Sequence, residues 1–150
     1  MRGIENIESW LGDGDWDVIQ FNWGLWDMYG WWYYDIDRSP GQYESRLEVL
    51  VTRLEQSGAS LIWAPTTLVF PVGEMQEKVK IDLETEKAYL ETASRIMKSH
   101  GIEINDLHGF MESKRERYAI ADDDVHYTEA GYRALAKQVS KSISQALARN

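Results

Sequence analysis

The sequence of 150 residues contains no cysteine. This absence excludes disulfide bonds, a thiolate nucleophile and cysteine-based zinc sites, and it leaves no redox signature of the compartment. Basic residues are also scarce, because 16 Lys and Arg stand against 25 Asp and Glu, for a formal net charge of −9. Binding of phosphate backbones depends on clustered Lys and Arg, so this balance argues against a nucleic-acid partner.

Long hydrophobic runs are missing as well. No uninterrupted apolar stretch approaches the roughly 18–20 residues that a membrane-spanning helix needs, so no membrane partner is expected. Residues 1–7 run directly into an amphipathic stretch, which predicts no signal peptide and, by default, a cytoplasmic location. No internal repeat, low-complexity tract or Pro/Gly-rich linker divides the chain, which predicts one domain over residues 1–150.

Motifs that hold cofactors are also absent. The sequence has no H-E-x-x-H pair, no phosphate-binding glycine loop and no dinucleotide fingerprint, so neither a metal nor a cofactor is expected. The acidic stretch 35–41 is interpreted as a turn rather than a metal site. His100, near a helix end, and His108, after a strand, are interpreted as solvated or backbone-bonded side chains.

Aromatic residues, in contrast, are abundant. Seven Trp and eight Tyr occur in 150 residues, many of them between Trp16 and Tyr43. With 43% apolar and 27% charged residues, the composition is that of a globular domain. Two interpretations of the aromatic segment stay open: its rings line a binding site as flat apolar walls, or they pack the core and cover an interface.

Short β-branched runs alternate with amphipathic stretches along the chain. Buried strands are expected over 17–22, 59–64 and 102–107, and helices over 4–11, 43–56, 76–100 and 128–147. In the last helix, the expected apolar stripe is Tyr132, Leu135, Val139, Ile143 and Leu147. This alternation predicts an α/β fold with a parallel sheet covered by helices on both faces, and with ligands bound beyond the carboxyl ends of the strands. Three strands are few for such a sheet.

Two polar features lie where chemistry is expected. Asp123 stands three residues before His126 on the loop that precedes the last helix, and a carboxylate so placed can hold Nδ1 of the ring and leave Nε2 free to accept a proton. The plainer interpretation is that residues 122–124 are solvated and favour the helix N-terminus. Asn22 ends a buried strand, where its amide can donate to a developing oxyanion or bond the turn backbone.

Taken together, these blocks resemble the SGNH/GDSL hydrolases. Residues 16–27, W-D-V-I-Q-F-N-W-G-L-W-D, are similar to the family block in which an Asn closes a strand. Residues 123–132, D-D-V-H-Y-T-E-A-G-Y, are similar to the block in which Asp and His precede the last helix. Residues 64–67, A-P-T-T, also fit the family pattern. The resemblance implies a three-layer α/β/α domain of flavodoxin-like type. It implies that His126 is the general base, Asp123 its orienter and Asn22 the oxyanion donor. The substrate would lie beside aromatic residues of the following loop: Trp23, Trp26, Trp31 and Trp32.

The family's nucleophilic serine lies on an earlier block, and no serine here occupies a matching position. Residues 1–7 resemble the helix downstream of the family's second block, which implies a truncated domain without the first two of five strands. Attack would then come from a water activated by His126, or from a hydroxyl of another chain. The missing strands would leave residues 18–22 at an open sheet edge, which predicts a homo-oligomer.

The leading hypothesis is a carboxylic-ester hydrolase acting on short acyl or aryl esters, or on O-acetyl groups of sugars. The alternative is a catalytically weak or dead remnant that serves as an oligomeric binding scaffold. A carbohydrate-binding module is a third possibility, and it rests only on the aromatic cluster.

Overall fold

The computed structural model describes residues 2–28, 37, 39–67, 83–121 and 124–149. In chain order the elements are α1 (Arg2–Leu11), β1 (Val18–Phe21), α3 (Pro40–Glu55), β2 (Ser60–Trp63), α5 (Leu83–Ser99), β3 (Glu103–Ile104), α6 (Leu107–Glu112), α7 (Arg115–Tyr118) and α8 (Glu129–Leu147). The part of the 76–100 helix that precedes residue 83 lies outside the described residues.

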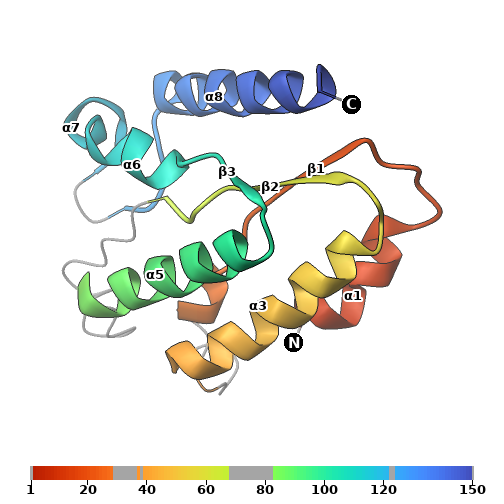
Figure 1. The fold of residues 1–150 in the computed structure, drawn as a ribbon. Helices are drawn as coiled ribbons and strands as arrows, with labels where there is room; N and C mark the ends of the chain where they lie inside the picture. Colours follow the sequence, from red (N-terminus) through yellow and green to blue (C-terminus); the bar gives the residue numbers. More distant parts are fainter. Residues whose placement is uncertain (1, 29–36, 38, 68–82, 122–123, 150) are drawn as a thin grey trace.

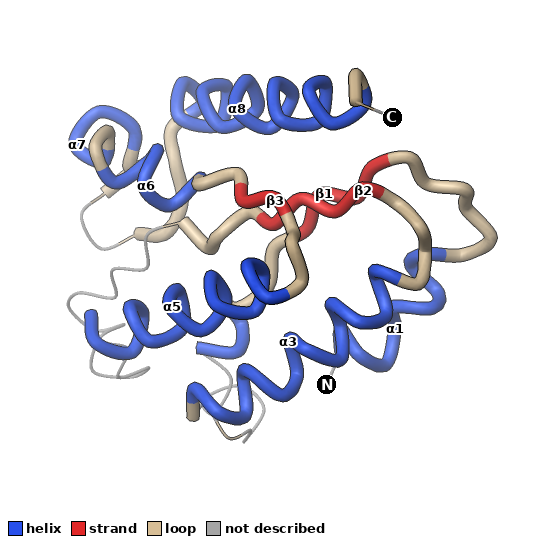
Figure 2. The backbone as a smooth tube through the Cα atoms, viewed as in Figure 1, coloured by secondary structure: helices blue, strands red, loops and turns tan. Residues whose placement is uncertain are grey.

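The sheet is parallel, with strand order β1-β2-β3. Val18 of β1 lies opposite Ser60 of β2, and Ile62 lies opposite Glu103 of β3. Helices α1, α3 and α5 cover one face and α8 covers the other, so the predicted three-layer α/β/α arrangement is confirmed (Figures 1 and 2). In the described part of the chain, no helix is long and apolar enough to cross a membrane.

The core lies between the sheet and the pair α3–α5. Its buried residues come at helical spacing from both helices and include Leu47, Val51, Ala93 and Met97, with Trp63 from β2. Gly58 and Gly101 follow α3 and α5 with φ of 75° and 68°. Only glycine adopts such angles without strain, which is why the chain turns back into a strand after each of these helices.

Helix α8 is less buried than its apolar stripe predicts. Tyr132 is 49% exposed and Leu147 is 48% exposed. Nineteen helical residues span roughly 28 Å, whereas a four-residue strand spans roughly 13 Å. Part of α8 therefore extends past the strands, and the ends of the stripe stay in contact with solvent.

A short polar chain joins α8 to the sheet. Gln138 donates to Asn105 (3.2 Å), and Asn105 donates to Gln20 of β1 (3.3 Å). Asn105 is only 4% exposed, so these bonds satisfy an amide that burial would otherwise leave without partners.

Candidate active site

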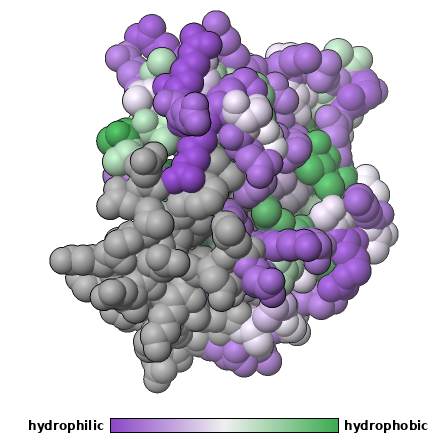
Figure 3. Space-filling view, turned by 90° about the vertical axis from the view of Figure 1, so that its left-hand side faces the viewer, coloured by the Kyte–Doolittle hydropathy of each residue, from purple (hydrophilic) through white to green (hydrophobic). Residues whose placement is uncertain are grey.

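The three parallel strands all end at the same edge of the sheet. Asn22 follows β1, the turn Ala64–Thr67 follows β2, and α6 with His108 follows β3 shortly after. Figure 3 views the molecule from the side toward which the strands run, and outside the grey residues this face is mostly hydrophilic with small hydrophobic areas. Ligands of open α/β sheets bind at this edge.

Asn22 is bound to the turn that follows β2. Its Nδ2 donates to the carbonyl oxygen of Ala64 at 2.7 Å and lies 3.4 Å from Oγ1 of Thr66. A side-chain amide has two N–H groups, so one is firmly held and the other makes a long contact. The short bond and the long contact together set the direction of the amide, and the N–H that makes the long contact can also donate to a ligand oxygen.

His126 is paired with Asp124. Oδ1 of Asp124 accepts from Nδ1 of His126 at 2.5 Å and from the His126 backbone N at 2.9 Å, and these bonds hold the pKa of Asp124 below its usual value. A carboxylate can only accept, so Nδ1 carries the proton and Nε2 keeps its lone pair. The ring is 65% exposed and in contact with solvent. Asp123 lies outside the described residues, and its role stays a prediction.

The loop with His126 is fixed on both sides. Tyr127 forms an antiparallel bridge with Ala119, and Thr128 caps α8 by accepting from the N–H of Gly131 at 3.2 Å. A Cβ on Gly131 would lie 2.9 Å from Cβ of Tyr127. Only glycine allows the start of α8 to approach Tyr127 this closely. Residues 127–131 therefore support the loop that carries His126.

The two halves of the predicted site approach the same turn. Tyr127, next to His126, is 6% exposed and forms a side-chain hydrogen bond with Thr67. Burial raises the pKa of Tyr127 more than this hydrogen bond lowers it. Asn22 reaches the neighbouring Thr66 from the end of β1. The structure thus places Asn22 and Tyr127, the neighbour of His126, in contact with residues of the same segment, 64–67.

The predicted aromatic wall is only partly described. The ring of Trp23 packs against α1, where a Cβ on Gly3 would lie 1.7 Å from Cζ2, and its centroid is 5.8 Å from that of Trp10. Trp23 therefore packs against α1, whereas Trp26 is 59% exposed, and the place of both beside a substrate stays a prediction. Trp31 and Trp32 lie outside the described residues.

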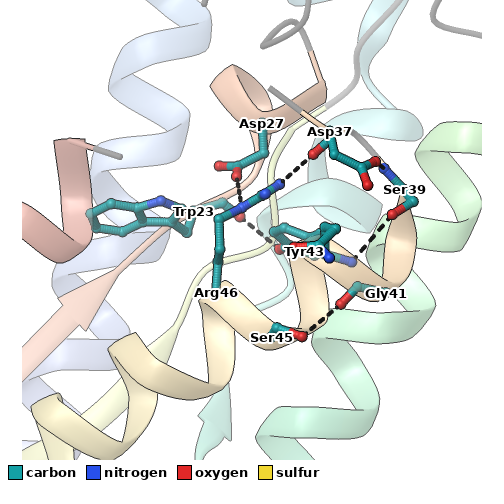
Figure 4. Close-up of polar contacts among 9 residues, drawn as sticks. Trp23, Asp27, Asp37, Ser39, Gly41, Tyr43, Ser45 and Arg46 are labelled. Atoms are coloured by element: carbon teal, nitrogen blue, oxygen red, sulfur yellow. Dashed lines mark hydrogen bonds and ion pairs between the residues drawn. The ribbon is translucent and has the colours of Figure 1, made fainter. Parts of the chain in front are cut away.

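A buried ion pair holds the segment that follows Asn22 (Figure 4). Nε of Arg46 donates to Oδ1 of Asp27 at 2.9 Å, and Nη2 donates to the carbonyl of Asp37 at 3.0 Å. Burial raises the pKa of Asp27 more than the Arg46 charge lowers it. Tyr43 adds a bond from its hydroxyl to the carbonyl of Trp23 at 2.9 Å. No sequence signal links these residues, because their contacts depend on the path of the loop.

Gly24 lies where the loop after β1 crosses the core. Its φ is +140°, and a Cβ would lie 3.1 Å from the Tyr43 hydroxyl and 3.3 Å from Oγ1 of Thr66. A side chain here would crowd the hydroxyl groups of Tyr43 and Thr66. Within the described ranges, no group of three His, Asp or Glu side chains could hold a metal ion.

Known proteins share this fold and sequence pattern. The profile of the GDSL-like lipase/acylhydrolase family matches residues 5–139. One similar solved structure is LAE5, an alpha/beta hydrolase enzyme from the metagenome of Lake Arreo, Spain, with a TM-score of 0.67 and 20% identity over 92% of this chain and 63% of that chain. The lipase/acylhydrolase from Enterococcus faecalis has a TM-score of 0.68 and 17% identity over 94% of this chain and 68% of its own. The acetyl xylan esterase AlAXEase has a TM-score of 0.67 and 14% identity over 95% of this chain and 72% of its own. No curated protein matches.

At these identities the three structures speak for the fold alone. The chain spans between 63% and 72% of their lengths while they account for at least 92% of it. The likeness therefore extends over nearly all of this chain and over only part of each neighbour.

Proposed function

Because the chain belongs to the GDSL-like lipase/acylhydrolase family, we propose that it hydrolyses carboxylic esters with short acyl or aryl groups, O-acetyl groups of sugars among them. One observation carries the proposal. An imidazole whose Nδ1 is held by a carboxylate directly precedes Tyr127, which hydrogen-bonds Thr67, and the amide of Asn22 contacts Ala64 and Thr66 of the same segment. A general base and an oxyanion donor at one site are the parts that acyl transfer requires.

The proposed reaction uses each group once. Nε2 of His126 takes a proton from the attacking water, whose oxygen forms a bond to the ester carbonyl carbon. The carbonyl oxygen becomes an oxyanion, to which Asn22 donates while its long contact with Oγ1 of Thr66 keeps the amide in place. The C–O bond to the leaving group then breaks, the imidazolium returns its proton to the leaving alkoxide or aryl oxide, and a carboxylic acid and an alcohol are released.

Water is the nucleophile in this proposal because no serine of the chain matches the family's nucleophile position. The exposed ring of His126 is in contact with solvent, which makes a water available. Enzymes that lose the serine of a triad keep a residual rate enhancement of about 10³–10⁴ over water, from the oxyanion hole and substrate binding. Turnover at the low end of esterase rates is therefore expected.

The test is hydrolysis of p-nitrophenyl acetate and p-nitrophenyl butyrate by the purified protein, its His126→Ala variant and its His100→Ala variant. His100 lies between α5 and β3, at the opposite edge of the sheet from residues 64–67, and serves as the matched control for adventitious catalysis by surface imidazoles. We expect the rate to fall at least tenfold in His126→Ala and to persist in His100→Ala. Equal rates in all three proteins would reject the proposal.

A second candidate function, an oligomeric binding scaffold, is favoured by the open edge of β1. The carbonyl oxygens of Asp17 and Phe21 accept from the backbone N–H groups of Ser60 and Ala64, which belong to the β2 side. Successive residues of a strand direct their backbone groups to opposite sides, so the N–H and C=O groups of Val18 and Gln20 point away from β2. No described strand pairs with that side. Residues 18–21 contain neither a charge nor a proline, the usual protection of an edge.

A second copy of the chain fits this edge. An antiparallel pairing with its two-fold axis at Gln20 places Val18 opposite Asn22 and Ile19 opposite Phe21 of the other copy. In this register Asp17 lies opposite Trp23, so no two acidic residues face each other despite the net charge of −9.

A further inference from the structure

His108 is the second imidazole at the carboxyl edge of the sheet, and the proposed mechanism does not use it. Asp106 caps α6 by accepting from the N–H of Gly109 at 2.9 Å, and Leu107 and Met111 anchor the helix in the core. This arrangement turns His108 toward the turn after β2, where its side chain is only 17% exposed. Its position is thus set by the helix rather than by solvent.

The ring of His108 holds the backbone of Thr66. Nδ1 lies 3.0 Å from the Thr66 carbonyl oxygen, and because a carbonyl can only accept, Nδ1 carries the proton. A carboxylate oxygen of Glu86, a residue 5% exposed on α5, lies 3.9 Å from the same nitrogen.

Thr66 needs such a support because it lies beyond the sheet. β2 ends at Trp63, and the last ladder-type bond runs from the N–H of Ala64 to the carbonyl of Phe21 at 2.8 Å. Two residues further, His108 binds the carbonyl of Thr66 while Asn22 contacts its hydroxyl. The two contacts use different atoms of one residue, so the position of the hydroxyl depends on how the carbonyl is held.

We propose that His108 is a positioning residue that orients Asn22 through Thr66. By holding the Thr66 carbonyl, His108 keeps Oγ1 at the place where it meets the second N–H of Asn22, and thereby fixes the direction of the amide that donates to the oxyanion. The inference rests on the proposed function for its catalytic meaning. The orientation itself is a property of the folded protein and is measurable without turnover.

The decisive experiment follows the side-chain amide of Asn22 by ¹⁵N–¹H NMR. Its two proton resonances are assigned by their loss in Asn22→Asp. We expect them to move in His108→Leu, which fills the space but has no donor, and to return to the wild-type positions in His108→Asn, whose amide nitrogen is attached to Cγ as Nδ1 is. His100→Leu, a change at the opposite edge of the sheet, is the matched control and leaves them unchanged.

A second variant guards against misfolding of His108→Leu. Thr66→Val keeps the carbonyl that His108 binds and removes the hydroxyl that Asn22 contacts, so it also moves the Asn22 resonances. Wild-type resonances in His108→Leu, or in Thr66→Val if His108→Leu does not fold, would overturn the inference.

The activity arm separates this inference from the proposed function. In an active protein, His108→Leu lowers kcat by about 3–10-fold, the factor that one hydrogen bond represents, with KM unchanged, and His108→Asn restores kcat. If the wild-type protein hydrolyses no ester, the proposed function fails while the NMR result still decides the inference. If His108→Leu changes KM alone, His108 contacts substrate and the positioning role is wrong.

Discussion

Oδ1 of Asp124 accepts two hydrogen bonds from His126, one from the ring Nδ1 at 2.5 Å and one from the backbone N at 2.9 Å. The two bonds close a tight local turn that sets the ring's direction.

Replacement of Asp124 by Asn tests this relationship. The variant keeps an oxygen that accepts both bonds but removes the charge, so we expect kcat/KM to fall about tenfold, since a charge-assisted hydrogen bond is roughly twice as strong as a neutral one. Asp123→Asn is the matched comparison. If it alone lowers kcat/KM, the orienting role belongs to Asp123, as the family resemblance implies.

The buried pair Asp27–Arg46 should be essential for stability. Arg46→Met leaves the Asp27 carboxylate buried without its counter-charge, and breaking such a pair costs about 3–5 kcal/mol. Urea denaturation followed by circular dichroism measures this loss. In an Asp27→Asn background the same change should cost clearly less. Equal losses in both backgrounds would mean that the pair contributes no coupling.

His100 should make the protein more stable at slightly acidic pH. Hydrogen bonds with Glu48 and Glu55 of α3 raise its pKa above the ordinary value of 6.5. A group with a raised folded-state pKa contributes stability that is complete below pH 6.5 and is lost as the pH rises through the folded-state pKa. The glutamates are about 40% exposed, which limits the gain to about 1 kcal/mol.

Thermal or urea denaturation between pH 5.5 and 8.5 measures this dependence. The wild-type protein should lose stability over this range relative to His100→Gln, which has no titrating ring. Parallel curves for the two proteins would show that the contacts of His100 with α3 do not couple to its protonation.

The edge of β1 predicts self-association that one residue can abolish. Val18→Pro removes an N–H that points away from β2 and so leaves the β1–β2 ladder intact, whereas Ile19→Pro removes an N–H on the β2 side. Light scattering coupled to gel filtration should give a dimer for the wild type and a folded monomer for Val18→Pro. A wild-type monomer at all concentrations, or a Val18→Pro dimer, would contradict the proposed pairing.

The local pattern of apolar and polar residues was enough to predict the strands and the long helices. The strands stand out because β-branched and aromatic residues are bounded by turn residues, as in 17–22, and the long helices because their apolar residues recur at helical spacing. The short helices α6 and α7 are not predicted from the sequence, because six and four residues contain too few helical turns to show a periodic pattern of apolar residues. Glycine is required at positions 3 and 131 because other residues pack closely against their backbone, but only the fold shows which residues these are.

The site was predictable only as separate halves. Asn22 and His126 were identified by their places at a strand end and before a helix, positions that local sequence can specify. That Asn22 and Tyr127 both contact residues 64–67, and that His108 binds the same segment, follows from the parallel register and from the place of α6, which no local signal encodes.

The central claim is that His126 and Asn22 act on one transition state, and a double-mutant cycle on kcat/KM for p-nitrophenyl acetate tests it most directly. Residues that work as a unit give strongly non-additive losses. We therefore expect Asn22→Ala to lower kcat/KM clearly in the wild-type background and by less than about twofold once His126 is Ala. The same fold-loss from Asn22→Ala in both backgrounds would mean that the two residues act independently, and would contradict the account.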